Sequence, residues 1–214
     1  MIVLDLFCGT KSISKAFEAR GHTVFTVDWD KRFKPDLAGD IGTLTAQDII
    51  NLCGGTPDVI WASPDCATYS LAGIFHHRTK NYETGECEPR SEYAHKCDKV
   101  NQNVLALIRE VKPKYWFIEN PRAGLRTMKF MRDLPRYTVT YCQYGDKRQK
   151  YTDIWTNHPN PKFKPPCKVG DKCHEAAPRG SRSGTLGLKN SKVRAKIPDK
   201  LCIHIVNICE VDNE

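Results

Sequence analysis

The first half of the chain alternates short apolar runs with stretches whose apolar residues recur at helical spacing. Apolar runs at 2–7, 22–30 and 57–63 predict buried strands, and amphipathic stretches at 12–21 and 45–54 predict helices between them. Because strands and helices alternate, the pattern predicts an α/β fold with a doubly wound, mostly parallel sheet.

The second half continues this pattern and then loses it. A helix is expected over roughly 98–112, and further strands at 115–120, 136–145 and 153–157. Residues 158–196 are rich in proline, glycine, lysine and serine and show no periodicity, which predicts a short loop-rich appendage.

The length of 214 residues suits one main core. We therefore expect a main domain over 1–157, the appendage over 158–196, and a C-terminal helix within 197–214 that packs back on the main domain. No stretch approaches the roughly 18 consecutive apolar residues of a membrane span, and the N-terminus lacks the features of a signal peptide. The expectation is a soluble intracellular protein without a membrane partner.

Cysteine usage and charge refine this expectation. The ten cysteines are scattered through apolar stretches, which is typical of reduced thiols in a cytosolic protein. Of the net charge of +8, residues 147–200 hold 14 lysines and arginines against four acidic residues. Such a basic segment favours a polyanion partner, and a basic surface without a partner is the alternative.

Chemistry-bearing residues follow several predicted strands, where open α/β sheets bind their ligands. Gly9 permits a tight turn after the first strand, and the helix that follows offers backbone amides to a carboxylate. Asp28 stands where an acid commonly contacts ribose hydroxyls, Trp29 can lie against an adenine, and Asp40 in GDIG offers a third contact. Together they predict an adenosyl cofactor.

Two further residues predict covalent chemistry. Cys66 follows a Ser-Pro-Asp turn after the strand at 57–63, and Glu119 ends the strand at 115–120. A glutamate at the end of a buried strand is costly unless it is partnered or functional. The pair indicates a thiol nucleophile and a carboxyl acid, with a buried structural thiol as the alternative for Cys66.

The motifs DLFCGT, DWD, GDI, SPDCATYS, FIENP, YGDKRQK and RAKIPDKLC occur in this order along the chain. The ordered set resembles the motifs of the cytosine-5 DNA methyltransferases and covers nearly the whole chain. The resemblance implies a Rossmann-like class I methyltransferase domain over 1–157 that binds S-adenosyl-L-methionine, with 158–196 in place of the target-recognition region. It implies these cofactor contacts: Asp5, Phe7, Cys8, Gly9, Thr10, Asp28, Trp29, Asp40, Ile41 and Pro64.

The resemblance also implies a mechanism. Cys66 would add to carbon 6 of cytosine while Glu119 holds ring nitrogen 3, which makes carbon 5 nucleophilic enough to accept a methyl group. The base would have to leave the helical stack to reach the pocket. Asn120 would fix the turn at the strand end. Arg148 and Lys150 match two positions of a Gln-x-Arg-x-Arg motif imperfectly, with Thr152 at the third. They would contact the base carbonyl or a phosphate and favour the thiolate.

Two of the motifs depart from the family pattern. Asp65-Cys66-Ala67 stands where the family usually has Pro-Cys-Gln, and Lys11 replaces a second glycine in the first loop. If the carboxylate of Asp65 points inward, it raises the pKa of the thiol; turned outward to a backbone amide or a lysine, it would be harmless.

The expected DNA contacts are few. Residues 71–98 are polar and predict a loop that closes over the substrate. A short or degenerate DNA target is expected, because direct base reading normally needs one bidentate side chain per base. The expected nucleic-acid contacts are Ser70, Arg78, Lys80, Arg179, Arg182 and Lys189.

The appendage also holds a candidate metal site. Cys167, Cys173 and His174, together with His158, offer four ligands for a tetrahedral zinc ion in a segment with too few apolar residues to fold by itself. Free thiols are the alternative.

We therefore expect an S-adenosylmethionine-dependent DNA cytosine-5 methyltransferase, monomeric and active in the cytoplasm of a prokaryote or a phage-infected host. Two alternatives stay open. The same catalytic residues also serve in enzymes that methylate cytosine in tRNA, and the departures at Asp65 and Lys11 would suit a non-catalytic nucleic-acid-binding module.

Overall fold

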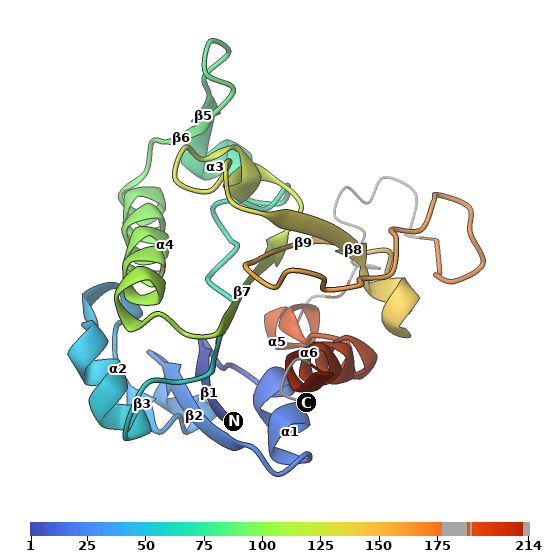
Figure 1. The fold of residues 1–214 in the computed structure, drawn as a ribbon. Helices are drawn as coiled ribbons and strands as arrows, with labels where there is room; N and C mark the ends of the chain where they lie inside the picture. Colours follow the sequence, from blue (N-terminus) through green and yellow to red (C-terminus); the bar gives the residue numbers. More distant parts are fainter. Residues whose placement is uncertain (177–187, 189, 212–214) are drawn as a thin grey trace.

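Seven strands form one sheet in the order β3-β2-β1-β4-β7-β9-β8 (Figure 1). The computed structural model describes residues 1–176, 188 and 190–211. The first five strands of this order are parallel, β9 runs antiparallel to β7, and β8 runs antiparallel to β9. This arrangement confirms the predicted mostly parallel α/β sheet. The strands are β1 (Ile2–Leu6), β2 (Thr23–Asp28), β3 (Leu37–Ala38), β4 (Val59–Ala62), β7 (Tyr115–Pro121), β8 (Arg136–Thr140) and β9 (Tyr151–Thr156).

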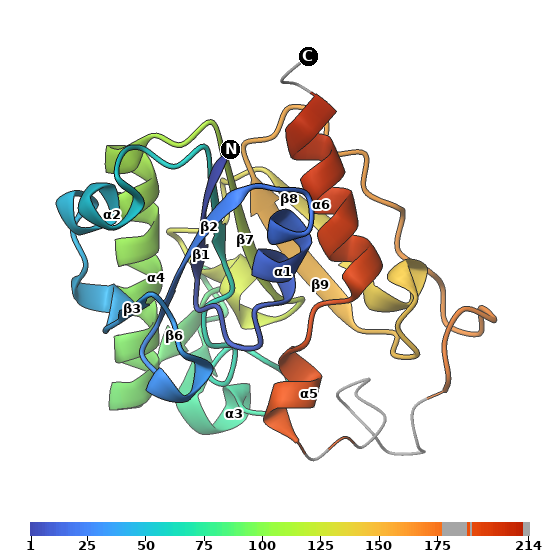
Figure 2. The same cartoon turned by 90° about the horizontal axis from the view of Figure 1, so that it is seen from below.

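Helices cover both faces of the sheet (Figure 2). α2 and α4 lie on one face, and α1 and α6 on the other. Side chains alternate along β1, so Val3 joins the apolar cluster under α1 and α6, and Leu4 joins the cluster under α2 and α4. The helices are α1 (Ser12–Glu18), α2 (Ala46–Cys53), α3 (Ile74–His77), α4 (Glu92–Val111), α5 (Ser191–Ala195) and α6 (Asp199–Val211).

The helix boundaries follow from capping residues. The hydroxyl of Thr45 accepts from the backbone amide of Asp48 and the carboxylate of Asp48 accepts in return, so a capping box starts α2, and Gly54 ends it at φ 68°. α4 starts at Glu92, earlier than the predicted 98, because the side chain of Ser91 accepts from the amide of Ala94. Polarity alone had placed this first part of α4 in a loop.

The polar stretch 71–98 has more structure than predicted. It contains α3 and a two-stranded hairpin, β5 (Arg78–Lys80) and β6 (Cys87–Pro89), which projects beyond the sheet. The strand predicted over 136–145 ends at Thr140 and is followed by the 3-10 helix η4 (Tyr141–Tyr144). Three further 3-10 helices are η1 (Lys31–Phe33), η2 (Ile41–Thr43) and η3 (Gly124–Thr127).

Among its described residues, the predicted loop-rich appendage over 158–196 contains one short helix, α5, near its end. Residues 157–176 contain neither helix nor strand, and the predicted C-terminal helix is present as α6, which packs on α1. None of the helices in the described part is both long and apolar enough to cross a membrane.

A buried ion pair joins the stretch after β4 to α4. Arg78 donates from Nη2 to Oδ1 of Asp98 at 2.6 Å, and its side chain is fully buried. Its Nε donates to the carbonyl of Thr68, and its guanidinium lies 4.0 Å from the ring centre of Tyr69. The expected phosphate contact by Arg78 is therefore wrong, because this side chain connects Thr68 and Asp98 inside the protein.

The substitution Asp98→Asn removes the negative charge of the pair and leaves the guanidinium of Arg78 buried and unpaired. It is therefore expected to lower the free energy of unfolding by about 3 kcal/mol. Urea unfolding measures the change. Lys96→Gln is the matched control, since Lys96 pairs with Asp40 at 3.2 Å on the surface and should cost under about 1 kcal/mol. Equal losses of unfolding free energy in the two variants would contradict a stabilising role of the buried Arg78–Asp98 pair.

Candidate active site

The predicted reactive groups gather at one edge of the sheet. β1, β4 and β7 are parallel neighbours, so the segments that follow them meet at their carboxyl ends. The segments after β1 and β4 carry the first loop and Cys66, and Glu119 lies in the last part of β7 itself. The strand-end reasoning of the sequence analysis is confirmed for this arrangement.

The first loop takes unusual backbone conformations. Phe7, Gly9 and Lys11 have φ values of 61°, 46° and 58°. Lys11 thus adopts the left-handed conformation that glycine accommodates most easily, and its ammonium donates to the carbonyl of Lys34 at 2.8 Å. The backbone at Lys11 therefore adopts a conformation that suits the glycine of the family pattern, and the side chain of Lys11 fixes the loop through its hydrogen bond.

Several predicted cofactor residues shape this loop from inside. The buried carboxylate of Asp5 accepts from the hydroxyl of Ser14 at 2.5 Å, and burial raises the pKa of Asp5 to about 7. Burial also raises the pKa of the Cys8 thiol to about 12. Asp28 accepts from the amides of Gly9 at 3.0 Å and Asp30 at 2.9 Å, so it joins the first loop to the end of β2.

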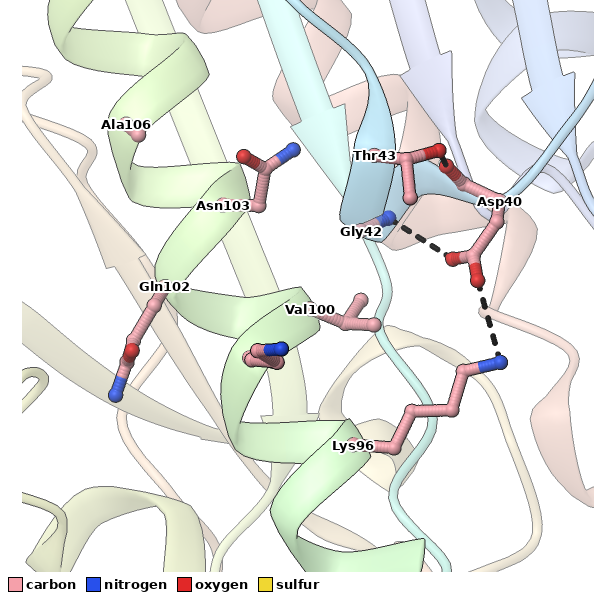
Figure 3. Close-up of a pocket in the computed structure, with 9 residues that line it drawn as sticks. Asp40, Gly42, Thr43, Lys96, Val100, Gln102, Asn103 and Ala106 are labelled. Carbon is pink, nitrogen blue, oxygen red and sulfur yellow. Dashed lines mark hydrogen bonds and ion pairs between the residues drawn. The ribbon is translucent and has the colours of Figure 1, made fainter.

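The residues predicted near the adenine lie at the surface or next to it. Trp29 exposes 71% of its surface, whereas Ile41 is buried. Asp40 accepts from the amide of Gly42, which lowers its pKa, and lines a cavity of about 550 Å³ between η2 and α4 (Figure 3). Among the predicted cofactor residues, Asp40 alone lines this cavity in the described part of the chain.

The nucleophile loop is held from both sides. Asn120 donates from Nδ2 to the carbonyl of Pro64 at 3.0 Å, in agreement with its expected role in fixing the turn. Asp65 accepts from the amide of Ala67 at 2.8 Å and from the hydroxyl of Tyr93 on α4. The carboxylate of Asp65 is thus turned to a backbone amide and a hydroxyl, but its negative charge still contributes to the raised pKa of the Cys66 thiol.

The thiol of Cys66 is protonated at neutral pH. Burial raises its pKa to about 11, the positive charge of Lys150 opposes that increase, and the negative charges of Glu119 and Asp65 add to it. The structure therefore brings Cys66, Glu119 and Lys150 close enough to interact electrostatically.

Glu119 is buried at the end of β7 and has two partners. The hydroxyl of Tyr141 donates to its Oε1 at 2.9 Å, and Nζ of Lys150 lies 3.7 Å from the same oxygen. Burial, and then the negative charge of Glu119, raise the pKa of Tyr141 well above its usual value, so Tyr141 stays a neutral donor. Sequence reasoning missed Tyr141; its position at the end of the RYTVTY run was the available signal.

Arg148 does not join this group. Its Nε donates to Oδ1 of Asp146 at 2.9 Å, and its Nη1 donates to the carbonyl of Arg194 in α5 at 3.1 Å. The predicted contact of Arg148 with the base or a phosphate is wrong because its carboxylate partner, two residues earlier, directs the guanidinium toward α5. Lys150 is the member of the motif that reaches Glu119.

The remaining predicted nucleic-acid contacts lie in different parts of the chain. The amide of Ser70 donates to the carbonyl of Cys66 at 2.8 Å, and Lys80 stays exposed on β5 with Nζ 5.3 Å from the ring centre of Tyr82. Arg179, Arg182 and Lys189 lie outside the described residues.

The predicted zinc ligands are divided as well. Cys167, Cys173 and His174 come together, but with Cys142 as the fourth member. His158 instead is buried under α6: its Nδ1 accepts from the amide of Asn160 at 3.2 Å, so its Nε2 donates to the carbonyl of Ile208 at 3.0 Å. Its prediction as a ligand is wrong.

A viral relative aligns with nearly the whole chain. The chain is 28% identical over 227 residues to a probable DNA (cytosine-5)-methyltransferase of Frog virus 3 (isolate Goorha), and the alignment covers 98% of this chain and 100% of that protein.

Solved structures share the fold. A putative DNA modification methyltransferase encoded within a prophage of E. coli has a TM-score of 0.54 at 16% identity, over 73% of this chain and 46% of its own. The Entamoeba histolytica methyltransferase EhMeth has a TM-score of 0.50 at 17% identity, over 78% of this chain and 57% of its own. The chain thus spans about half the length of these structures.

The family itself follows from a match to the C-5 cytosine-specific DNA methylases over residues 1–140, which include both Cys66 and Glu119. Since this match covers well over half of the chain, the protein belongs to the family of C-5 cytosine-specific DNA methylases.

Proposed function

We propose that this family member methylates carbon 5 of cytosine in DNA with Cys66 as the nucleophile and Glu119 as the partner of ring nitrogen 3. The observation that carries the proposal is the position of Glu119, buried between Tyr141 and Lys150 at the strand edge that also holds Cys66. A buried carboxylate with such partners, next to a thiol, is typical of a reactive site.

S-adenosyl-L-methionine supplies the methyl group as an electrophilic sulfonium. The donor set fits such a molecule: Trp29 offers an exposed indole for an adenine, and the carboxylates of Asp28 and Asp40 offer acceptors for hydroxyl and amino groups. Gly9 and the backbone after β1 would hold its amino-acid end. The buried side chains of Asp5 and Cys8 would support that loop from the protein interior.

Cys66 reacts as its thiolate. The thiol first gives up its proton to solvent, and the positive charge of Lys150 stabilises the thiolate that results. The sulfur then adds to carbon 6 of cytosine. Tyr141 and Lys150 both lie at Oε1 of Glu119, so Oε2 is the oxygen that remains to bring a proton to ring nitrogen 3 as the sulfur adds. After methylation, carbon 5 loses its proton to water, the carbon–sulfur bond breaks to release the thiolate, and the proton on nitrogen 3 returns to Glu119.

DNA would approach over the segment that follows Cys66. Ser70 and Lys80 are the proposed phosphate contacts among the described residues, together with Arg179, Arg182 and Lys189 beyond them. A base flipped out of the duplex would have to reach the edge where Cys66 and Glu119 meet.

Covalent trapping tests the nucleophile and the substrate together. The full chain with S-adenosylmethionine and duplex DNA containing 5-fluorocytosine is expected to form a denaturant-resistant adduct, because fluorine cannot leave carbon 5 as a proton does. Cys66→Ala should abolish the adduct and Cys87→Ser, a half-buried cysteine outside the site, should retain it. Electrophoresis and intact mass measure both.

The other outcomes decide between the alternatives. An adduct with fluorinated tRNA but not with DNA would assign RNA as the substrate. Binding of S-adenosylmethionine without an adduct on either nucleic acid would support a non-catalytic binding module.

The raised pKa of Cys66 predicts a pH dependence. Because its pKa is about 11, the thiolate fraction, and with it the alkylation rate of Cys66 by iodoacetamide, should rise about tenfold per pH unit between roughly pH 7 and 9. Lys150→Met should lower the rate roughly three- to tenfold at each pH, since it removes the charge that favours the thiolate. Peptide mass spectrometry follows Cys66 separately from the other cysteines. A rate that levels off near neutral pH would refute a raised pKa.

A further inference from the structure

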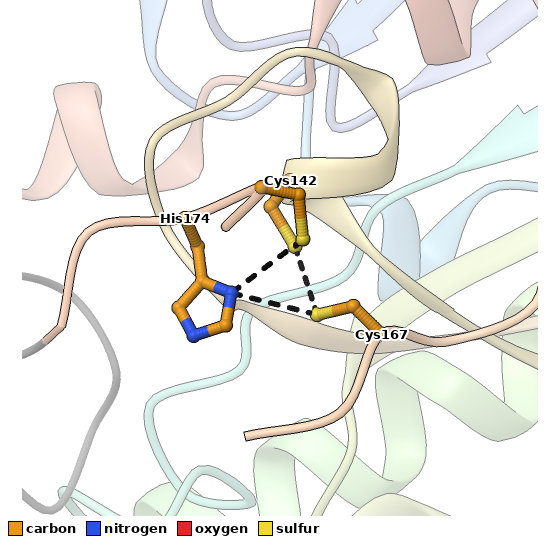
Figure 4. A group of neighbouring side chains, drawn as sticks. Cys142, Cys167 and His174 are labelled. Carbon is orange, nitrogen blue, oxygen red and sulfur yellow. Dashed lines mark hydrogen bonds between the residues drawn. The ribbon is translucent and has the colours of Figure 1, made fainter. Parts of the chain in front are cut away.

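Three cysteines and a histidine converge where the appendage meets η4 (Figure 4). Cys142 belongs to η4, and Cys167, Cys173 and His174 come from the appendage. One ligand atom from each lies within 4.8 Å of the others. These residues lie outside the proposed catalytic group, and methyl transfer does not use them.

The distances suit a tetrahedral metal ion. Sγ of Cys173 lies 3.6 Å from Sγ of Cys142, and Nδ1 of His174 lies 3.7 Å from Sγ of Cys167 and 3.6 Å from Sγ of Cys173. With bonds of about 2.3 Å to sulfur and about 2.0 Å to nitrogen, a tetrahedral zinc ion separates two sulfurs by about 3.8 Å and sulfur from nitrogen by about 3.5 Å. The sulfurs of Cys142 and Cys167, at 3.1 Å, would move slightly apart.

Hydrogen-bond donors surround the sulfurs. The side-chain amide of Gln149 donates to Sγ of Cys167 at 3.3 Å, and that of Gln143 donates to Sγ of Cys173 at 3.6 Å. The backbone of Cys167 is held by Thr140 and Tyr151 at 3.0 and 2.9 Å. Such outer contacts orient ligands and stabilise thiolates at metal sites.

We propose that Cys142, Cys167, Cys173 and His174 bind one zinc ion through three thiolates and Nδ1 of the imidazole. Four protein ligands leave no open position, so the site is structural. It fastens a segment that has neither helix nor strand over 157–176 to the end of β8.

The site also adjoins the supports of Glu119. Cys142 directly follows Tyr141, and Gln149 directly precedes Lys150, so both partners of Glu119 are next in sequence to residues at the metal site. Resting on the proposed function, we infer that the zinc ion positions Tyr141 and Lys150 and that its loss lowers kcat rather than the affinity for S-adenosylmethionine.

Zinc content tests the site without reference to activity. The purified full chain should hold about one zinc ion by mass spectrometry of the element, and cobalt(II) in its place should show the strong absorption of thiolate ligands in tetrahedral geometry. The double substitution Cys167→Ser/Cys173→Ser should remove the bound zinc. Cys87→Ser should retain it.

A conservative exchange guards against a simple folding failure. His174→Cys, which keeps four ligands, should retain zinc, and His174→Ala should bind it at least about tenfold more weakly. A chain that binds no zinc when the ion is added, a double variant that keeps it, or a disulfide between Cys142 and Cys167 in the purified protein would overturn the proposal.

Kinetics test the positioning role separately. In the zinc-depleted enzyme, kcat for DNA methylation should fall at least about tenfold and return when zinc is restored, while S-adenosylmethionine binding stays unchanged. Unchanged kcat after depletion would leave the zinc site standing but overturn its role in positioning. Absence of methylation in the zinc-loaded enzyme would contradict the proposed function and not the metal site.

Discussion

The buried carboxylate of Glu119 is the constraint on which the rest of the site depends. An ionised carboxylate at the end of a buried strand costs several kcal/mol unless charge and hydrogen bonds compensate for lost water. Both compensating groups, Tyr141 and Lys150, lie on the segment between β8 and β9. The antiparallel strands β8 and β9 therefore do more than widen the parallel sheet. The segment between them places Tyr141 and Lys150 beside Glu119, where they offset the cost of burying its carboxylate.

The nucleophile loop is constrained in a complementary way. Asn120, the neighbour of Glu119, holds the carbonyl of Pro64, and Tyr93 holds the carboxylate of Asp65. Further along, Arg78 connects Thr68 with Asp98 on α4. The loop is thus attached to β7 on one side and to α4 on the other. The sulfur of Cys66 is therefore positioned by these two elements and not by the loop alone.

Sequence patterns predicted the elements that depend on local periodicity. The parallel strands β1, β2, β4 and β7, the helices α2 and α6, and the convergence of Cys66 and Glu119 follow from apolar runs and from the rule that parallel strand ends meet. The two-residue strand β3 was not predicted. Lys11 could not be interpreted from the sequence, since its left-handed backbone is visible only in the folded loop.

The wrong predictions share one physical cause. The polar stretch around Arg78 predicts a phosphate contact, and the family motif predicts a contact of Arg148 with the base or a phosphate, yet Asp98 and Asp146 pair with them in the folded chain. His158 was grouped with Cys167 by separation along the chain, whereas Cys142 reaches the same place from η4. Side-chain partners that depend on tertiary contacts have no periodic signature.

The position of α6 has a consequence for synthesis. Leu201 and Ile205 of this helix complete the apolar cluster that also contains Phe17 of α1 and Trp61 of β4. Because the ribosome makes residues 199–211 after every strand in the described part of the chain, this face of the sheet stays incompletely covered until they emerge. Trp61 and Phe117, which lie on the strands that lead to Cys66 and Glu119, therefore acquire their final packing only after the basic segment that precedes α6 has been made.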